Sequence, residues 1–101
     1  MSTVYVVQEN PKVDVVSANR FGELKALANK SEQVHLKPEN IINNLKRQLR
    51  CFNDEDYLLL LGDPALIGAA MIVASNFNNG NVKVLKWDRI EKMYYPVKLS
   101  F

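Results

Sequence analysis

The most constraining feature of the chain is the run YLLLLGDPALIGAAMIVA at residues 57–74, which carries a single charged residue, Asp63. A membrane-spanning helix needs about 20 predominantly apolar residues, but the Gly-Asp-Pro sequence at 62–64 interrupts this run. An aspartate at the centre of a bilayer costs on the order of 3 kcal/mol. The run is therefore better divided into a strand at Tyr57–Leu61 and a helix at Ala65–Asn76, and we expect no membrane partner.

Two segments predict strands in the middle of a sheet. Tyr57–Leu61 is apolar throughout, and Thr3–Gln8 has valines on both faces. Strands that are apolar on both faces are typical of parallel sheets that are covered on both sides. A first helix is predicted at Pro38–Phe52, because Pro favours the first helical position and the apolar stripe of this segment leaves a basic outer face.

The remaining segments predict further strands. Gly80–Arg89 and Met93–Phe101 form a hairpin, since the last segment alternates between two sets of side chains. Val13–Val16 and Gly22–Ala28 are weaker strand candidates, with a turn at residues 17–20 between them. The second candidate could also be a helical turn, because Glu, Leu, Lys and Ala favour helix.

Together these elements predict one α/β domain over residues 1–101. We expect a small mixed sheet with Thr3–Gln8 and Tyr57–Leu61 as central parallel strands, two helices packed against it, and a C-terminal antiparallel hairpin. The chain has 101 residues, of which 48% are hydrophobic and 24% charged. This composition is that of a compact soluble domain.

Charge and cysteine content exclude some partners and some chemistry. The formal net charge of +2 is far from the strongly basic balance of a dedicated nucleic-acid binder. Cys51 is the only cysteine and His35 the only histidine, which excludes an internal disulfide and leaves a Cys-His or zinc site short of ligands. We expect Cys51 to be a buried thiol. Since no secretory leader precedes the first strand, the expected location is the reducing cytoplasm.

Nucleotide-binding motifs do not occur in the sequence. Neither GxGxxG nor GxxxxGK[ST] is present, and we expect no cofactor and no metal. The acidic run Asp54-Glu55-Asp56 is more typical of a solvated turn than of a cation site.

The ends of the two central strands form a candidate ligand edge. If the strands run the same way, Gln8, Glu9 and Asn10 meet Gly62 and Asp63 at the carboxyl edge of the sheet, where open α/β sheets bind ligands. The alternative interpretation is structural, because Asp is a preferred N-cap, Pro a preferred first helical residue, and Gly eases a tight turn. We favour the structural interpretation.

A second candidate site is a surface of basic and aromatic side chains. Its residues are Lys46, Arg47 and Arg50 of the first helix and Lys83, Lys86, Trp87, Arg89, Tyr94 and Tyr95 of the hairpin. On a β-ribbon such side chains bind single-stranded nucleic acid, but the rings fit a core equally well, and edge strands carry lysines to prevent pairing. Nucleic acid is therefore not the favoured partner. The aromatics of the hairpin, with Phe101, also predict a homodimer.

Several short motifs resemble a set of small proteins encoded by tailed bacteriophages. These motifs are YVVQ near the start, FGELKAL, DYLLLLGDP, IG, and NNGNVKVLKWDR followed by YYPVKL. The resemblance covers most of the chain except the segment Asn29–Pro38, and Lys25 stands where the group has an apolar residue. It implies a phage origin and an infected-cell cytoplasm. It implies no activity, so no catalytic residue can be transferred.

Three hypotheses for function follow. The first is a small, cytoplasmic, non-catalytic phage accessory protein that binds and modulates a host or phage protein. The second is a small-ligand-binding or enzymatic domain with its site at Glu9 and Asp63. The third is nucleic-acid binding through the C-terminal hairpin. We favour the first, because the chain is short, lacks catalytic motifs and resembles phage proteins.

Overall fold

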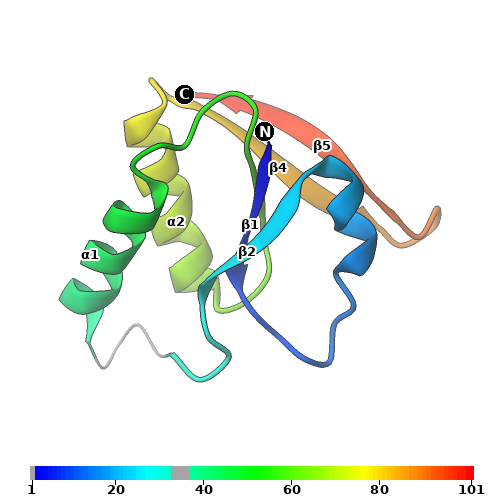
Figure 1. The fold of residues 1–101 in the computed structure, drawn as a ribbon, viewed down its shortest axis with the longest axis horizontal. Helices are drawn as coiled ribbons and strands as arrows, with labels where there is room; N and C mark the ends of the chain where they lie inside the picture. The colour runs from blue at the N-terminus through cyan, green and yellow to red at the C-terminus, as the bar shows by residue number, and fades with distance from the viewer. Residues whose placement is uncertain (1, 33–36) are drawn as a thin grey trace.

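The computed structural model describes residues 2–32 and 37–101, which form an α/β fold with a five-stranded mixed sheet (Figure 1). The strands are β1 (Thr3–Gln8), β2 (Glu23–Ala28), β3 (Tyr57–Leu59), β4 (Asn81–Asp88) and β5 (Met93–Ser100). The helices are the 3-10 helix η1 (Val16–Phe21) and the α-helices α1 (Pro38–Leu49) and α2 (Pro64–Phe77). The fold class expected from the sequence is confirmed.

The strand order explains on which face each helix lies. The order is β2-β1-β3-β4-β5; the first four strands are parallel and β5 is antiparallel to β4. The chain moves one way along the sheet from β1 to β2 and the other way from β2 through β3 to β4. Because such connections are right-handed, η1 lies on one face and both α-helices lie on the other (Figure 1). We name these the η1 face and the helix face.

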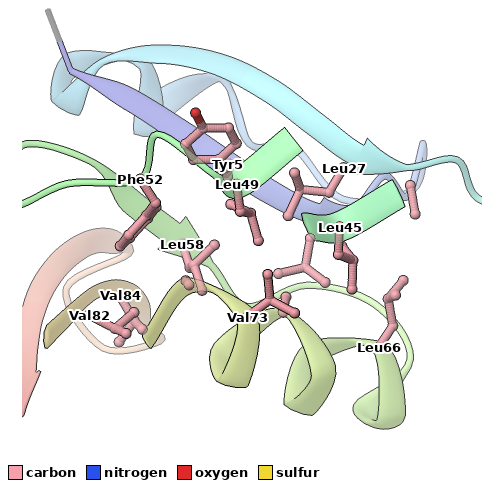
Figure 2. Packing of buried hydrophobic residues seen from close by; sticks show 14 of the residues in the cluster. Tyr5, Leu27, Leu45, Leu49, Phe52, Leu58, Leu66, Val73, Val82 and Val84 are labelled. Carbon is pink, nitrogen blue, oxygen red and sulfur yellow. The ribbon is translucent and has the colours of Figure 1, made fainter. Parts of the chain in front are cut away.

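The helix face carries the larger core (Figure 2). Alternate strand side chains, among them Tyr5, Leu58 and Val84, pack against buried residues of the helices such as Leu45 and Val73. α2 packs on β1, on β4 and against α1. The predicted packing of both helices on the sheet is therefore confirmed.

The η1 face carries a smaller core. Its buried members are Val4, Val6, Ala18, Leu59, Leu85 and Tyr94. Because η1 has only six residues, it covers part of this face. Beyond it, Leu60 and Trp87 remain partly exposed.

The apolar run at residues 57–74 divides as predicted. It gives the short central strand β3 and the helix α2, and Asp63 caps α2 by accepting a hydrogen bond from the backbone N–H of Ala65 at 2.9 Å. α2 ends at Phe77 with Asn78 as its C-cap, after which Asn79 and Gly80 adopt positive φ. None of the helices in the described residues is long and apolar enough to cross a membrane.

α1 also protects the outer edge of the sheet at β2. The carbonyl oxygen of Leu27 is bonded to side chains of α1, whereas the carbonyl of the neighbouring Ala28 accepts from the N–H of Glu9. The side-chain amides of Asn44 and Gln48 donate to this Leu27 oxygen at 3.4 and 2.9 Å. A strand edge whose carbonyl is already bonded is a poorer template for another strand.

Asp56 joins the start of β1 to the loop before β3. Its Oδ1 accepts from the N–H of Thr3 at 3.0 Å and its Oδ2 from the N–H of Asn53 at 3.1 Å. Asp56 is buried, whereas Asp54 and Glu55 are exposed. The expectation of a solvated turn is thus wrong for Asp56, because its carboxylate satisfies two backbone donors.

Two local expectations about the segment before β2 have different outcomes. Val13–Val16 is not a strand: Asp14 accepts from the N–H of Val16 at 2.9 Å, and the carbonyl of Val15 accepts from Ala18 at 2.9 Å. These local bonds turn the chain into η1, where a strand and a turn were expected. The strand at Gly22–Ala28 is confirmed as β2.

The end of α1 differs from the prediction. The helix stops at Leu49 rather than Phe52, because the last residues leave the helical path and the N–H of Phe52 bonds to the carbonyl of Leu49 at 2.9 Å. Phe52 is buried, but Cys51 is exposed, so the expectation of a buried thiol is wrong. His35 lies outside the described residues.

We predict that Asp56→Ala lowers the free energy of unfolding by about 2 to 4 kcal/mol, because two backbone N–H groups lose their acceptor. Asp54→Ala serves as the control, since Asp54 is exposed and, in the described part of the chain, accepts one hydrogen bond, from the side chain of Asn78; we expect a change below about 0.5 kcal/mol. Urea unfolding followed by circular dichroism measures both. Equal losses in the two variants would contradict the structural role of Asp56.

Candidate functional site

The carboxyl ends of β1 and β3 lie together, as the sequence predicts. Val6 pairs with Leu59 in parallel register, so that Gln8 and Asp63 come from neighbouring strand ends. The connections that leave β1 and β3 go in opposite directions along the sheet. Such a switch point is where open α/β sheets form a ligand crevice.

The side chain of Gln8 fills this crevice. Its Nε2 donates to the carbonyl oxygens of Asn29 at 3.1 Å and Glu32 at 2.9 Å, and its Oε1 accepts from the N–H of Asp63 at 2.9 Å. Gln8 is buried, and a Cβ on Gly62 would lie 2.4 Å from the Cβ of Gln8. The polar atoms that could hold a ligand here are therefore bonded to the protein's own backbone.

Glu9 and Asn10, the other residues of the predicted ligand edge, lie on the rim of a hollow on the η1 face. Both are exposed, and Asn10 accepts from the N–H of Lys12 at 3.0 Å. The hollow has a volume of about 430 Å³ and is also lined by Leu24 and Ala26. Asp63 does not line this hollow and is engaged in capping α2.

A larger groove lies beside this hollow, beyond the end of β3. Its volume is about 910 Å³, and the segment from Lys12 to Ser17, the end of β3 and the β4–β5 hairpin form its walls. The apolar residues that line it are Val13, Leu59, Leu60, Leu61, Val84, Leu85, Trp87, Tyr94 and Val97, of which Val84 and Val97 direct their side chains to the helix face. We call this the hairpin groove.

The groove exists because the chain turns away from β4 after Leu59. Leu59 pairs with Leu85, so that Leu61 would be the register partner of Trp87 if β3 continued. Instead, the N–H of Leu61 bonds to the carbonyl of Leu59 at 2.9 Å, and the Leu61 carbonyl accepts from the N–H of Gln8 at 3.0 Å. The chain therefore moves toward β1 and leaves the last residues of β4 without a neighbour on that side.

The backbone of Trp87 consequently faces the groove. In the hairpin, Phe101 N–H bonds to the Gly80 carbonyl at 2.8 Å, which makes every second cross-strand pair from that point a hydrogen-bonded pair. Trp87 and Tyr94 form a non-hydrogen-bonded pair. The N–H and C=O of Trp87 hence point to the β3 side, where β3 has already ended.

Side-chain contacts hold the ring of Trp87 at the groove wall. Trp87 and Tyr94 make an edge-to-face contact with ring centroids 4.9 Å apart, and Arg20 of η1 donates to the Tyr94 carbonyl at 2.9 Å. Tyr94 is buried, and this burial raises the pKa of its hydroxyl, with a smaller contribution from the charge of Asp14. Trp87 remains 42% exposed.

The predicted basic and aromatic residues do not form one surface. Trp87 and Tyr94 belong to the η1 face, whereas Lys86 and Tyr95 are their neighbours on the helix face. The Nζ of Lys83 lies 4.2 Å from the centre of the Tyr57 ring. Lys46, Arg47 and Arg50 belong to α1 and the turn after it, on the opposite side of the molecule from the hairpin (Figure 1).

The sequence did not indicate the hairpin groove. Leu60 reads as part of a central strand, but it lies past the end of β3 and is partly exposed. Within residues 2–32 and 37–101, no group of three or more His, Cys, Asp or Glu side chains could hold a metal ion.

Comparison with known proteins identifies a family to which the sequence is similar. A family model described as Phage Pam3 gp32-like protein matches residues 2–101. The match includes Asn29–Pro38, the segment that contributed nothing to the resemblance seen in the motifs. No curated protein and no solved structure matches the chain.

We predict that Gly62→Ala destabilises the protein by about 2 to 4 kcal/mol, because Gly62 has φ +120 and its Cβ would overlap Gln8. Gly68→Ala is the control. Gly68 is an exposed position of α2 with nothing within 4 Å of its Cβ, and we expect a gain of up to about 1 kcal/mol from helix propensity. Urea unfolding of both variants checks this. Unchanged stability in Gly62→Ala would show that Gln8 can leave the crevice.

We predict that the unfolding free energy falls as the pH rises above 10.0, the ordinary pKa of tyrosine. Burial raises the pKa of Tyr94 in the folded protein, so the neutral hydroxyl favours folding below pH 10 and this contribution disappears as the pH rises through the folded pKa. Tyr94→Phe should reduce the fall of the unfolding free energy with pH. Urea unfolding between pH 8 and 11, with phenolate absorbance as a second readout, measures it; an unchanged slope would contradict the assignment.

Proposed function

The chain belongs to the Phage Pam3 gp32-like protein family, and from this premise we propose that it is a phage accessory protein that acts by binding a segment of another protein. The binding site is the hairpin groove. The partner is a host or phage protein, and binding takes place in the cytoplasm of the infected cell. No catalytic step is part of this proposal.

The observation that supports this proposal most directly is the combination of an apolar groove with an open strand edge. Leu60, Leu61 and Val13 offer apolar surface, and Trp87 offers both its ring and its backbone N–H and C=O. An extended segment of a partner could take the place beside β4 that β3 vacates. Main-chain hydrogen bonds would then contribute affinity and the apolar side chains specificity.

Charge around the groove indicates the chemistry of the segment. Among the described residues that line the groove, Lys12, Asp14 and Lys86 are charged, and the side chain of Lys86 lies on the helix face of β4. The adjoining hairpin turn contains Arg89, Glu91 and Lys92, together with Ile90, which is 90% exposed. A segment with apolar side chains fits this surface, and a small negative charge on the segment would agree with the slight excess of basic residues around the groove.

The other two hypotheses have less support. A ligand or enzymatic site at the strand ends would need the polar atoms of Gln8 and Asp63, which are already bonded to backbone groups. Nucleic-acid binding would need the basic and aromatic side chains on one surface, but they are divided between two faces of the hairpin.

We predict that Trp87→Ala weakens partner binding by about tenfold or more, in keeping with the energy that a buried interface tryptophan contributes. Tyr95→Ala is the matched control, because Tyr95 is 38% exposed against 42% for Trp87. Tyr95 belongs to β5 of the same hairpin but does not line the groove. Tagged wild type and both variants are produced during infection, and co-purified proteins are quantified by mass spectrometry. The partner should remain with Tyr95→Ala and be lost with Trp87→Ala.

Three outcomes would contradict the proposal. One is a partner retained equally by both variants. Another is native mass spectrometry that finds a discrete small molecule bound to the purified protein, which would favour a ligand site. The third is co-purified nucleic acid whose binding falls steeply with added salt.

A further inference from the structure

α2 has an unusual composition for a helix at the surface. From Pro64 to Phe77 it contains no charged residue, although one side of it faces solvent. Ile72 on that side is 64% exposed. A surface helix normally carries charged and polar residues on its outer side, so the outer side of α2 resembles a surface that is covered.

The sheet continues this uncharged surface at its β5 edge. Val97, Leu99 and Phe101 point to the helix face, and Val97 and Leu99 are only partly buried against the core. Phe101 is 78% exposed and forms with Met71 and Ile72 a hollow of about 210 Å³. Within the sheet, α2 packs mainly on β1 and β4. In the described residues, no further helix covers β5 from this side.

We propose that a second copy of the chain covers this patch, which consists of Met71, Ile72, Ser75, Asn76 and Phe101, and that the protein is a homodimer with α2 of one copy beside α2 of the other. In a twofold dimer, each side chain near the axis meets its own copy. A charge in such a place would face an equal charge. The patch carries none, although 24% of the chain is charged, and it is therefore suited to self-association.

The two most exposed side chains of the patch supply only part of the area that a stable dimer buries. Ile72 and Phe101 together expose on the order of 250 Å² of mostly apolar surface, judged from the 150–250 Å² that a large side chain can bury. A stable interface buries about 800 Å² per partner, and homodimer interfaces are the more apolar ones. The two side chains would form the apolar centre, and the rest of the uncharged outer side of α2, with the partly buried Val97 and Leu99, would have to supply the larger part of the interface.

Pairing of the two β5 edges is a less suitable route to the dimer. The alternation fixed by the bond from Phe101 to Gly80 directs the backbone groups of residues 94, 96, 98 and 100 to the free edge. Pro96 has no N–H to donate there, and the Tyr94 carbonyl already accepts from Arg20. Proline at an outward position is a common protection against strand pairing. The contact therefore runs through side chains of α2 and β5.

The test is sedimentation equilibrium of the wild type and of two variants over about 1 to 100 µM, a range that covers moderate affinities. We expect the wild type to be a dimer in the upper part of this range. Ile72→Glu should raise the dimer dissociation constant by at least about a hundredfold, because it places two carboxylates together at an apolar contact. Val16→Glu is the matched control, since Val16 is 63% exposed on η1, and it should leave the dimer intact.

Circular dichroism and urea unfolding of Ile72→Glu show whether the variant folds, and Ile72→Ala, which changes less, should weaken the dimer by a smaller factor. A wild type that is monomeric at 100 µM would overturn the proposal, as would a dimer that Ile72→Glu leaves unchanged. A monomer that uses this patch to bind a different protein would also overturn it. The result is independent of the hairpin groove, because Trp87 packs on Tyr94 of the η1 face, whereas Ile72 belongs to α2, which packs on the helix face.

Discussion

Two hydrogen bonds at Leu61 decide the shape of the surface that the chain presents. The N–H of Leu61 bonds back to Leu59 and its carbonyl accepts from Gln8, so that the chain leaves β4 and joins β1. On one side this turn brings Gly62 and Asp63 to the side chain of Gln8, which closes the crevice at the switch point. On the other side it frees the end of β4 and opens the hairpin groove.

Because the crevice is closed and the hairpin groove is open, the fold is suited to a different function from that of a ligand-binding sheet. In a doubly wound sheet, the switch point supplies the ligand crevice because backbone groups diverge there. Here the side-chain amide of Gln8 bonds to those backbone groups. The open surface is the hairpin groove, which is apolar and includes the edge of β4 at Trp87. Such a surface suits a polypeptide better than a small polar ligand, which agrees with an accessory protein of a phage.

The two proposed contacts use opposite faces of the sheet and could therefore operate together. η1 is too short to cover its face to the end of the hairpin, which leaves the groove; two helices are too few to cover a five-stranded sheet, which leaves the patch beside α2. Both surfaces result from the same shortage of covering elements in a chain of 101 residues. A homodimer would present two hairpin grooves, and so could bind two partner segments at once.

Local patterns in the sequence determined most of the fold. Apolar periodicity, proline and turn residues predict the division of residues 57–74, the helix that begins at Pro38, the hairpin and the parallel central strands. Each of these signals acts over a few neighbouring residues. The same patterns placed Gln8 and Asp63 at one edge. Only the tertiary structure decided that Gln8 fills the crevice, that Asp56 is buried, and that Leu60 lies outside the sheet. These outcomes depend on hydrogen bonds between residues about 50 positions apart, and no local pattern encodes such a pairing.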